Sequence, residues 1–131
     1  MQQLKQLTSF EAACQVLGLD PGKVIPDFSC FPAQDHRSMI AHAKLVLIIR
    51  AANQLANGGK EWKPDFDNYD QWKYEAWFSK DEKGGSSGFR FNAYDDWHTA
   101  SHVGSRLCFI SREVAKYVAT TFVDLYNEYL L

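Results

Sequence analysis

The longest segment without a helix breaker places the strongest constraint on the fold of this chain. From about Gln34 or Asp35 to Asn57 there is no Pro or Gly, and Gly58-Gly59 then supplies a left-handed stop. The segment predicts a helix of about six turns. Apolar residues cover a broad arc of this segment: Met39, Ile40, Ala43, Val46, Leu47 and Ile49. We therefore expect a central core helix that is buried on more than one side.

Two further helices are predicted near the ends of the chain. Thr8 to Glu11 has the spacing of a capping box, and Gly18 suits a helix stop about two turns later. Ser111 is a typical N-cap residue, and apolar residues at helical spacing continue from it nearly to Leu131. The long helix therefore has a short helix before it and one last helix at the C-terminal end.

Three segments between the long helix and Ser111 have the period-two, aromatic-rich pattern of strands: Lys73 to Ser79, Phe89 to about Tyr94, and Ser105 to Ile110. In the last of them, Leu107 and Phe109 are expected on one face, and Arg106, Cys108 and Ile110 on the other. The sequence thus predicts an α+β fold in the order α-α-β-β-β-α. Its three-stranded antiparallel sheet should pack on the long central helix and the C-terminal helix.

Length and composition indicate a single globular domain over residues 1–131, with 46% hydrophobic and 23% charged residues. The longest aliphatic run, Leu45 to Ile49, is far shorter than the roughly 20 residues of a membrane span. The N-terminal residues lack the pattern of a secretory signal, so we expect a cytoplasmic protein without a membrane partner. Cys14, Cys30 and Cys108 form no CxxC pair, which indicates free and mostly buried thiols.

The aromatic residues are concentrated in one part of the chain. All four tryptophans lie within residues 62–97, where polar residues rather than aliphatic ones separate the rings. Large aromatic side chains supply most of the contact energy at many interfaces. The candidate contacts are Trp62, Trp72, Tyr74, Trp77, Phe91, Tyr94 and Trp97, with Arg90 beside them. About half of these rings should face the core of a small sheet, so fewer than half should touch a ligand.

Motifs with catalytic or metal-binding chemistry are sparse. His98 and His102 are four residues apart and could share a metal with Asp95 or Asp96, but a stacking or hydrogen-bonding role is commoner for such histidines. Either histidine could also approach Cys108 to form a nucleophilic pair. The oxygen-rich residues 65–70 do not fit a calcium loop and are typical of a solvated turn.

Phosphate-binding motifs are also missing, since neither glycine-rich segment has the lysine and helix of a P-loop. Arg90 and Arg106 could each bind a carboxylate or phosphate in a bidentate manner, although arginines more often stack on rings or pair with Asp. Residues 60–97 hold six Lys or Arg against nine Asp or Glu, and the whole chain has a net charge of −2. This balance disfavours nucleic acid as a partner.

Two blocks of sequence carry a resemblance to a known group of proteins. They are DHRSMIAHAKLVLIIRAANQLANGGKEWKPDFDNYDQWKYEAWF and SHVGSRLCFISREVAKYVATTFVDLYNEYLL. The chain resembles small uncharacterised proteins encoded by phages and prophages of gut Bacteroidetes, in which a helix ends before a WKPD-like turn and a GSRLCF-like strand leads into the last helix. The resemblance implies a cytoplasmic phage or mobile-element setting and brings no catalytic residues.

The sequence therefore favours a non-enzymatic binding or assembly protein that uses the aromatic residues of 62–97 and needs no cofactor. Its partner should be a protein, either another copy or a different chain, and a small molecule is possible. Two alternatives remain open. One is a small metal-dependent or Cys/His hydrolase, and the other is a protein that stacks single-stranded nucleic acid on its aromatic rings.

Overall fold

The computed structural model describes residues 3–68, 70–80, 89–97 and 106–131, and for residues 79–80 and 89–97 it describes the backbone alone. The elements in chain order are η1 (Gln3–Gln6), α1 (Phe10–Leu17), η2 (Ala33–Asp35), α2 (His36–Ala56), β1 (Lys73–Lys80), β2 (Phe89–Trp97), α3 (Arg112–Thr121) and α4 (Val123–Leu130). None of the helices in these residues is both long and apolar enough to cross a membrane.

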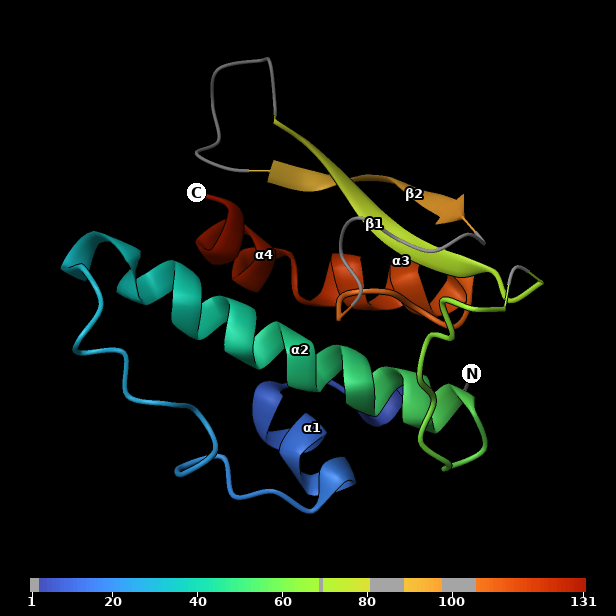
Figure 1. The fold of residues 1–131 in the computed structure, drawn as a ribbon, viewed down its shortest axis with the longest axis horizontal. Coiled ribbons are helices and arrows are strands. Elements are labelled where there is room, and N and C mark those ends of the chain that lie inside the picture. Colours follow the sequence, from blue (N-terminus) through green and yellow to red (C-terminus); the bar gives the residue numbers. More distant parts are fainter. Residues whose placement is uncertain (1–2, 69, 81–88, 98–105) are drawn as a thin grey trace.

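The long helix α2 confirms the first prediction and forms the centre of the molecule. It lies between α1 on one side and α3 and α4 on the other (Figure 1). Gly58 and Gly59 follow it with φ angles of 70° and 85°, a conformation that favours glycine. Of the apolar residues expected in its core, only Ile49 is fully buried. The buried set is Ala41, Leu45, Ile48, Ile49, Ala51, Ala52 and Asn53.

Local capping residues place the starts of α1 and α3. Ser9, rather than Thr8, caps α1, because its hydroxyl accepts a hydrogen bond of 3.0 Å from the backbone N–H of Ala12. Ser111 caps α3 as predicted, with its hydroxyl 3.3 Å from the backbone nitrogen of Val114. Each cap satisfies a backbone donor that the first turn of a helix leaves unpaired.

The prediction of one continuous C-terminal helix is wrong. The chain leaves helical geometry at Phe122, with φ −111° and ψ 29°, and α4 begins at the next residue. The carbonyl oxygen of Phe122 then accepts bonds from the backbone N–H groups of Leu125 and Tyr126. Phe122 and Tyr126 both lie in the hydrophobic core, as the four-residue spacing between them also predicts for one continuous helix.

The predicted α+β fold with a three-stranded sheet is also wrong. The described residues are mostly helical and contain a two-stranded antiparallel ribbon, β1 with β2, that runs from Lys73 opposite Trp97 to Lys80 opposite Phe89. A bulge interrupts the register between Trp77 and Phe78. The ribbon packs on α3 and α4 rather than on the long helix (Figure 1).

Of the expected third strand, Ser105 to Ile110, the structure describes residues 106–110, and within them the pairing with β1 is one bridge between Tyr74 and Phe109. Two backbone groups on the other edge of this segment form hydrogen bonds with a side chain of α2. The amide of Asn53 donates to the carbonyl oxygen of Cys108 at 3.0 Å and accepts from the backbone N–H of Ile110 at 2.9 Å. The segment therefore bonds β1 on one edge and a side chain of α2 on the other.

Candidate functional site

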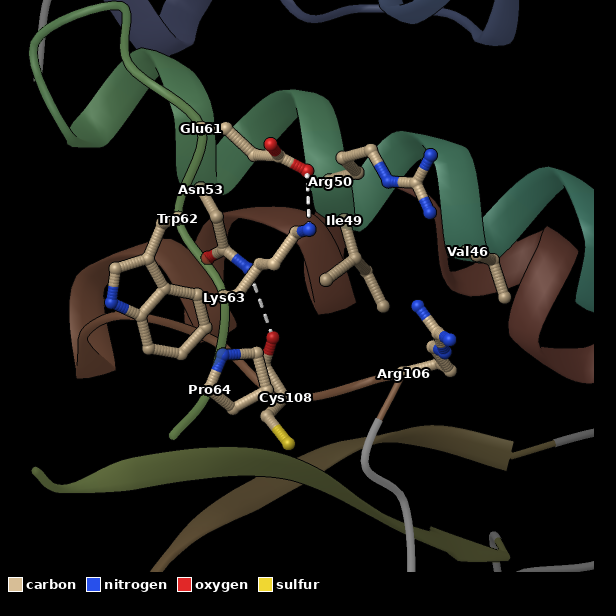
Figure 2. Close-up of a pocket in the computed structure, with 10 residues that line it drawn as sticks. All are labelled: Val46, Ile49, Arg50, Asn53, Glu61, Trp62, Lys63, Pro64, Arg106 and Cys108. Atoms are coloured by element: carbon tan, nitrogen blue, oxygen red, sulfur yellow. Dashed lines mark hydrogen bonds and ion pairs between the residues drawn. The ribbon is translucent and has the colours of Figure 1, made fainter. Parts of the chain in front are cut away.

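A narrow cleft lies between α2, residues 61–64 and residues 106–108, and Figure 2 draws the side chains that line it. Its volume is about 60 Å³, which suits a small group. Three of its side chains are basic: Arg50 on α2, Lys63 on the segment after α2, and Arg106. Arg106 is more than 40 positions from the other two in sequence and meets them only in the folded chain.

Asn53 forms the floor of this cleft and is 3% exposed. Figure 2 shows its amide directed at Cys108, whose carbonyl oxygen it binds. Because its other amide atom is also bonded, to Ile110, the side chain has a structural role and offers little to a ligand. Asn53 is a position of the candidate site that the sequence does not reveal, because Arg50 and Gln54 are also polar in this half of α2.

Trp62 is the one predicted aromatic contact that lines the cleft, where it is half-buried. The amide of Asn57 holds the preceding backbone by donating to the carbonyl oxygens of Lys60 and Glu61 at 3.2 and 3.4 Å. The carboxylate of Glu61 lies 3.7 Å from the ammonium of Lys63. This pair is exposed and long, so its contribution to stability is small.

The thiol of Cys108 also borders the cleft, but it is poorly suited to catalysis. Burial, together with the negative charge of Glu75, raises the pKa of this thiol to about 12. A protonated thiol is a weak nucleophile, which argues against the Cys/His hydrolase. Burial also raises the pKa of Cys14, and Cys30 is exposed, so the prediction of buried thiols holds for two of the three.

A second hollow, the aromatic groove, lies on the other side of residues 106–108. It is lined by Glu75, Ala76, Trp77, Phe78, Leu107, Tyr126, Tyr129 and Leu130, with a volume of about 220 Å³. Trp77 at its rim is 55% exposed and Leu130 is 44% exposed. Arg106 and Cys108 line the cleft while Leu107 lines the groove, so residues 106–108 separate two hollows of different chemistry.

The aromatic groove contains a buried polar atom that nothing in the described chain satisfies. The hydroxyl of Tyr126 has no hydrogen-bond partner there, and the ring lies 4.4 Å from that of Phe78, centroid to centroid. Burial, with the charge of Glu75 second, raises the pKa of this hydroxyl above its usual range. Buried hydroxyls in proteins are nearly always paired, so an unpaired one within the described chain is unusual.

Two other predicted contacts, one just before β1 and one within it, do not line either hollow. Trp72, just before the strand, is 46% exposed. Tyr74 is half-buried, pairs with Phe109 through its backbone, and has the guanidinium carbon of Arg112 at 5.8 Å from its ring centroid. Tyr74 is therefore tied to the packing of the segment that follows β2.

The remaining candidates lie in or after β2. The backbone register places Arg90 opposite Ser79, Phe91 opposite Phe78, Tyr94 opposite Ala76, Asp95 opposite Glu75, Asp96 opposite Tyr74 and Trp97 opposite Lys73. Their side chains lie outside what the structure describes, as do residues 98 and 102 altogether, so the suggested metal ligands His98 and His102 are not placed. Within the described residues, no group of three or more His, Cys, Asp or Glu could hold a metal ion.

The oxygen-rich turn before β1 surrounds an internal cation. Lys73 is fully buried, and its ammonium donates to the carbonyl oxygens of Asn68 at 3.0 Å and Gln71 at 2.8 Å. Asp65 and Asn68 close the turn by accepting bonds from backbone N–H groups two residues later. The predicted turn is confirmed, and the positive group at its centre is a lysine of the same chain.

Comparison of the chain with protein-family models, with curated proteins and with solved structures finds no match. The two hollows therefore carry the functional argument.

Proposed function

We propose that this chain is a non-enzymatic binding or assembly protein whose aromatic groove receives an apolar side chain of a partner protein. The observation that carries the proposal is an exposed apolar rim, Trp77 and Leu130, on a groove whose wall includes Tyr126, a residue with a buried hydroxyl that lacks a partner in the described chain. Exposed apolar side chains that surround a hollow are typical of interaction sites. The resemblance to phage and prophage proteins supports a mobile-element setting for this role.

The chemistry of the groove defines the occupant. Its walls are rings and aliphatic groups, which favour an aromatic or branched aliphatic side chain. The hydroxyl of Tyr126 is buried in the free protein, so the groove must open for a hydrogen-bonding atom of that occupant to reach it. A partner segment with an apolar anchor and a nearby carbonyl, hydroxyl or amide meets both requirements.

Selection of a random peptide library on the purified protein tests the proposal. The selected peptides should share an apolar anchor, and Trp77→Ala should weaken their binding by about tenfold or more, as expected for a central interface aromatic. Phe31→Ala is the matched control, since Phe31 is 45% exposed but lies on the segment between α1 and α2. Both variants should keep the melting temperature of the wild type, because both rings are exposed.

Three results would overturn the proposal. Selection could yield no binding peptide. Trp77→Ala could bind the selected peptides as tightly as the wild type does, or Phe31→Ala could weaken their binding as much as Trp77→Ala. Loss of binding together with a large fall in melting temperature would show that Trp77 supports the fold, and the groove would then lose its exposed anchor.

A further inference from the structure

The cleft beside α2 has an excess of positive charge that the described chain leaves uncompensated. Arg50, Lys63 and Arg106 line it against a single carboxylate, Glu61. That carboxylate lies beside Lys63, at 3.7 Å. Neither guanidinium has an ion pair or a hydrogen bond within the residues that the structure describes. The cleft therefore has two more cations than carboxylates, in a chain whose net charge is −2.

The two arginines occupy the same end of this cleft. Figure 2 shows Arg50 extending from α2 and Arg106 rising from the opposite wall, with Val46 beside them. Two like charges on facing walls repel each other, and an anion between them converts this repulsion into attraction on both sides. Guanidinium groups bind the oxygens of carboxylates and phosphates through paired N–H donors, so they suit an oxyanion better than a halide.

The number of basic side chains in the cleft indicates the charge of the anion that fits it. Asn53 already uses both of its amide atoms, so recognition depends on the three basic side chains. An excess of two cations matches a phosphate group, which carries a charge of roughly −1.5 to −2 near neutral pH, better than a carboxylate. A neighbouring hollow of about 250 Å³ shares Lys63, Pro64 and Arg106 with the cleft and is also lined by Phe66.

We propose that this cleft binds the phosphate group of a small phosphorylated ligand, with Arg50, Lys63 and Arg106 around the phosphate. The body of the ligand lies in the neighbouring hollow, over Pro64 and Phe66. The site is separate from the aromatic groove and shares no residue with it. This assignment goes beyond the proposed binding function and does not depend on it.

Calorimetric titration at constant ionic strength tests the site with two probes, inorganic phosphate and phenyl phosphate. Both should bind the wild-type chain, and phenyl phosphate should bind more tightly because its ring reaches Phe66. The double variant Arg50→Gln/Arg106→Gln should lose at least about tenfold in affinity for both probes. The matched control, Arg37→Gln/Lys116→Gln, removes the same charge from exposed positions outside the cleft and should stay within about twofold of the wild type.

Circular dichroism and melting temperature should show that both double variants fold, since all four side chains belong to exposed residues. The proposal is overturned if neither probe binds, or if the two double variants lose affinity equally. Equal affinity for the two probes would show that the neighbouring hollow does not contribute to binding, and that part of the proposal would be wrong. An oligonucleotide of deoxythymidines is the last probe. If it binds through Arg50 and Arg106 with a steep salt dependence while phosphate does not bind, the cleft is a nucleic-acid track and the proposal is wrong.

Discussion

The cleft and the aromatic groove lie on opposite sides of residues 106–108, and they differ in whether their buried polar atoms are hydrogen-bonded within the described chain. In the cleft, both amide atoms of Asn53 are bonded to the backbone of Cys108 and Ile110, while the charged groups stay at the exposed edge. In the groove, the hydroxyl of Tyr126 is buried and has no partner in the described chain. A buried polar group that is bonded to the backbone on both sides, as Asn53 is, belongs to the framework, whereas the Tyr126 hydroxyl makes no such contribution within the described chain.

Substitution of the two groups should change the free energy of unfolding differently, because the Asn53 amide has hydrogen-bond partners to lose and the Tyr126 hydroxyl has none in the described chain. A satisfied buried amide contributes modestly on balance, yet its removal leaves two backbone groups without partners, at about 1–3 kcal/mol each. An unsatisfied hydroxyl has already incurred that cost in the free protein. Substitution of Asn53 should therefore destabilise the chain, and substitution of the Tyr126 hydroxyl should not.

The largest expected effect comes from Asn53→Leu. It removes the partners of the Cys108 carbonyl and the Ile110 N–H, and the free energy of unfolding should fall by about 3 kcal/mol. Urea unfolding followed by circular dichroism measures the change. Asn57→Ala is the control, because the Asn57 amide bonds two carbonyls in exposed positions, and its loss should cost less than about 1 kcal/mol. Equal losses in the two variants would show that Asn53 does not hold the wall between the hollows.

The second largest expected effect is a loss of stability at alkaline pH. It arises from the Cys108 thiol, whose pKa is raised from 9.0 to about 12. Above pH 9 the unfolded chain releases this proton and the folded chain retains it, so stability is complete below pH 9 and is lost toward pH 12. The loss attributable to this group should approach about 1.4 kcal/mol per pH unit. Urea unfolding at about pH 8 and pH 10 should show a steeper loss in the wild type than in Cys108→Ala.

Cys30→Ala provides the control for that experiment, because Cys30 is exposed, and this variant should lose stability as steeply as the wild type. Iodoacetamide supplies an independent check on the native protein. Rapid alkylation of Cys108 near neutral pH would contradict the raised pKa and would restore the Cys/His hydrolase as a candidate.

The smallest expected effect has the opposite sign. Tyr126→Phe removes a buried hydroxyl that has no partner in the described chain, and it should raise the free energy of unfolding by about 1 kcal/mol. The ring contact with Phe78 should remain. The same variant should weaken the selected peptides that satisfy the hydroxyl. If Tyr126→Phe is less stable than the wild type, the hydroxyl has a partner in the free protein and the groove has no unsatisfied atom.

Features that depend on neighbouring residues could be predicted from the sequence. Gly58-Gly59 and Ser111 mark the end of α2 and the start of α3, because glycine and serine satisfy local backbone requirements there. The alternation at residues 106–108 also follows from local geometry, since an extended chain sends successive side chains to opposite sides. The predicted third strand is reduced to one bridge with β1, and its other edge is bonded by Asn53, a residue more than 50 positions earlier that no local pattern connects with it.

The candidate site was predictable only in part. The cluster of aromatics includes Trp77 on β1, which is exposed beside the groove. The sequence indicates Arg106 as a possible anion ligand, but its approach to Arg50 depends on the packing of α2 against a distant segment. The hydroxyl of Tyr126 has no partner in the described chain because of how its ring packs on Phe78 and the core, which no local pattern predicts.

The most direct test of the two-hollow account uses the tryptophan indole N–H signals in a two-dimensional NMR spectrum, assigned with single Trp→Phe variants. Trp62 reports on the cleft and Trp77 on the groove. Titration with inorganic phosphate should shift the Trp62 signal and leave Trp77 in place, whereas benzyl alcohol, an apolar ring with a hydroxyl, should do the reverse. If either probe moves both signals together, or if phosphate moves only Trp77, the two hollows are not chemically distinct sites and the account is contradicted.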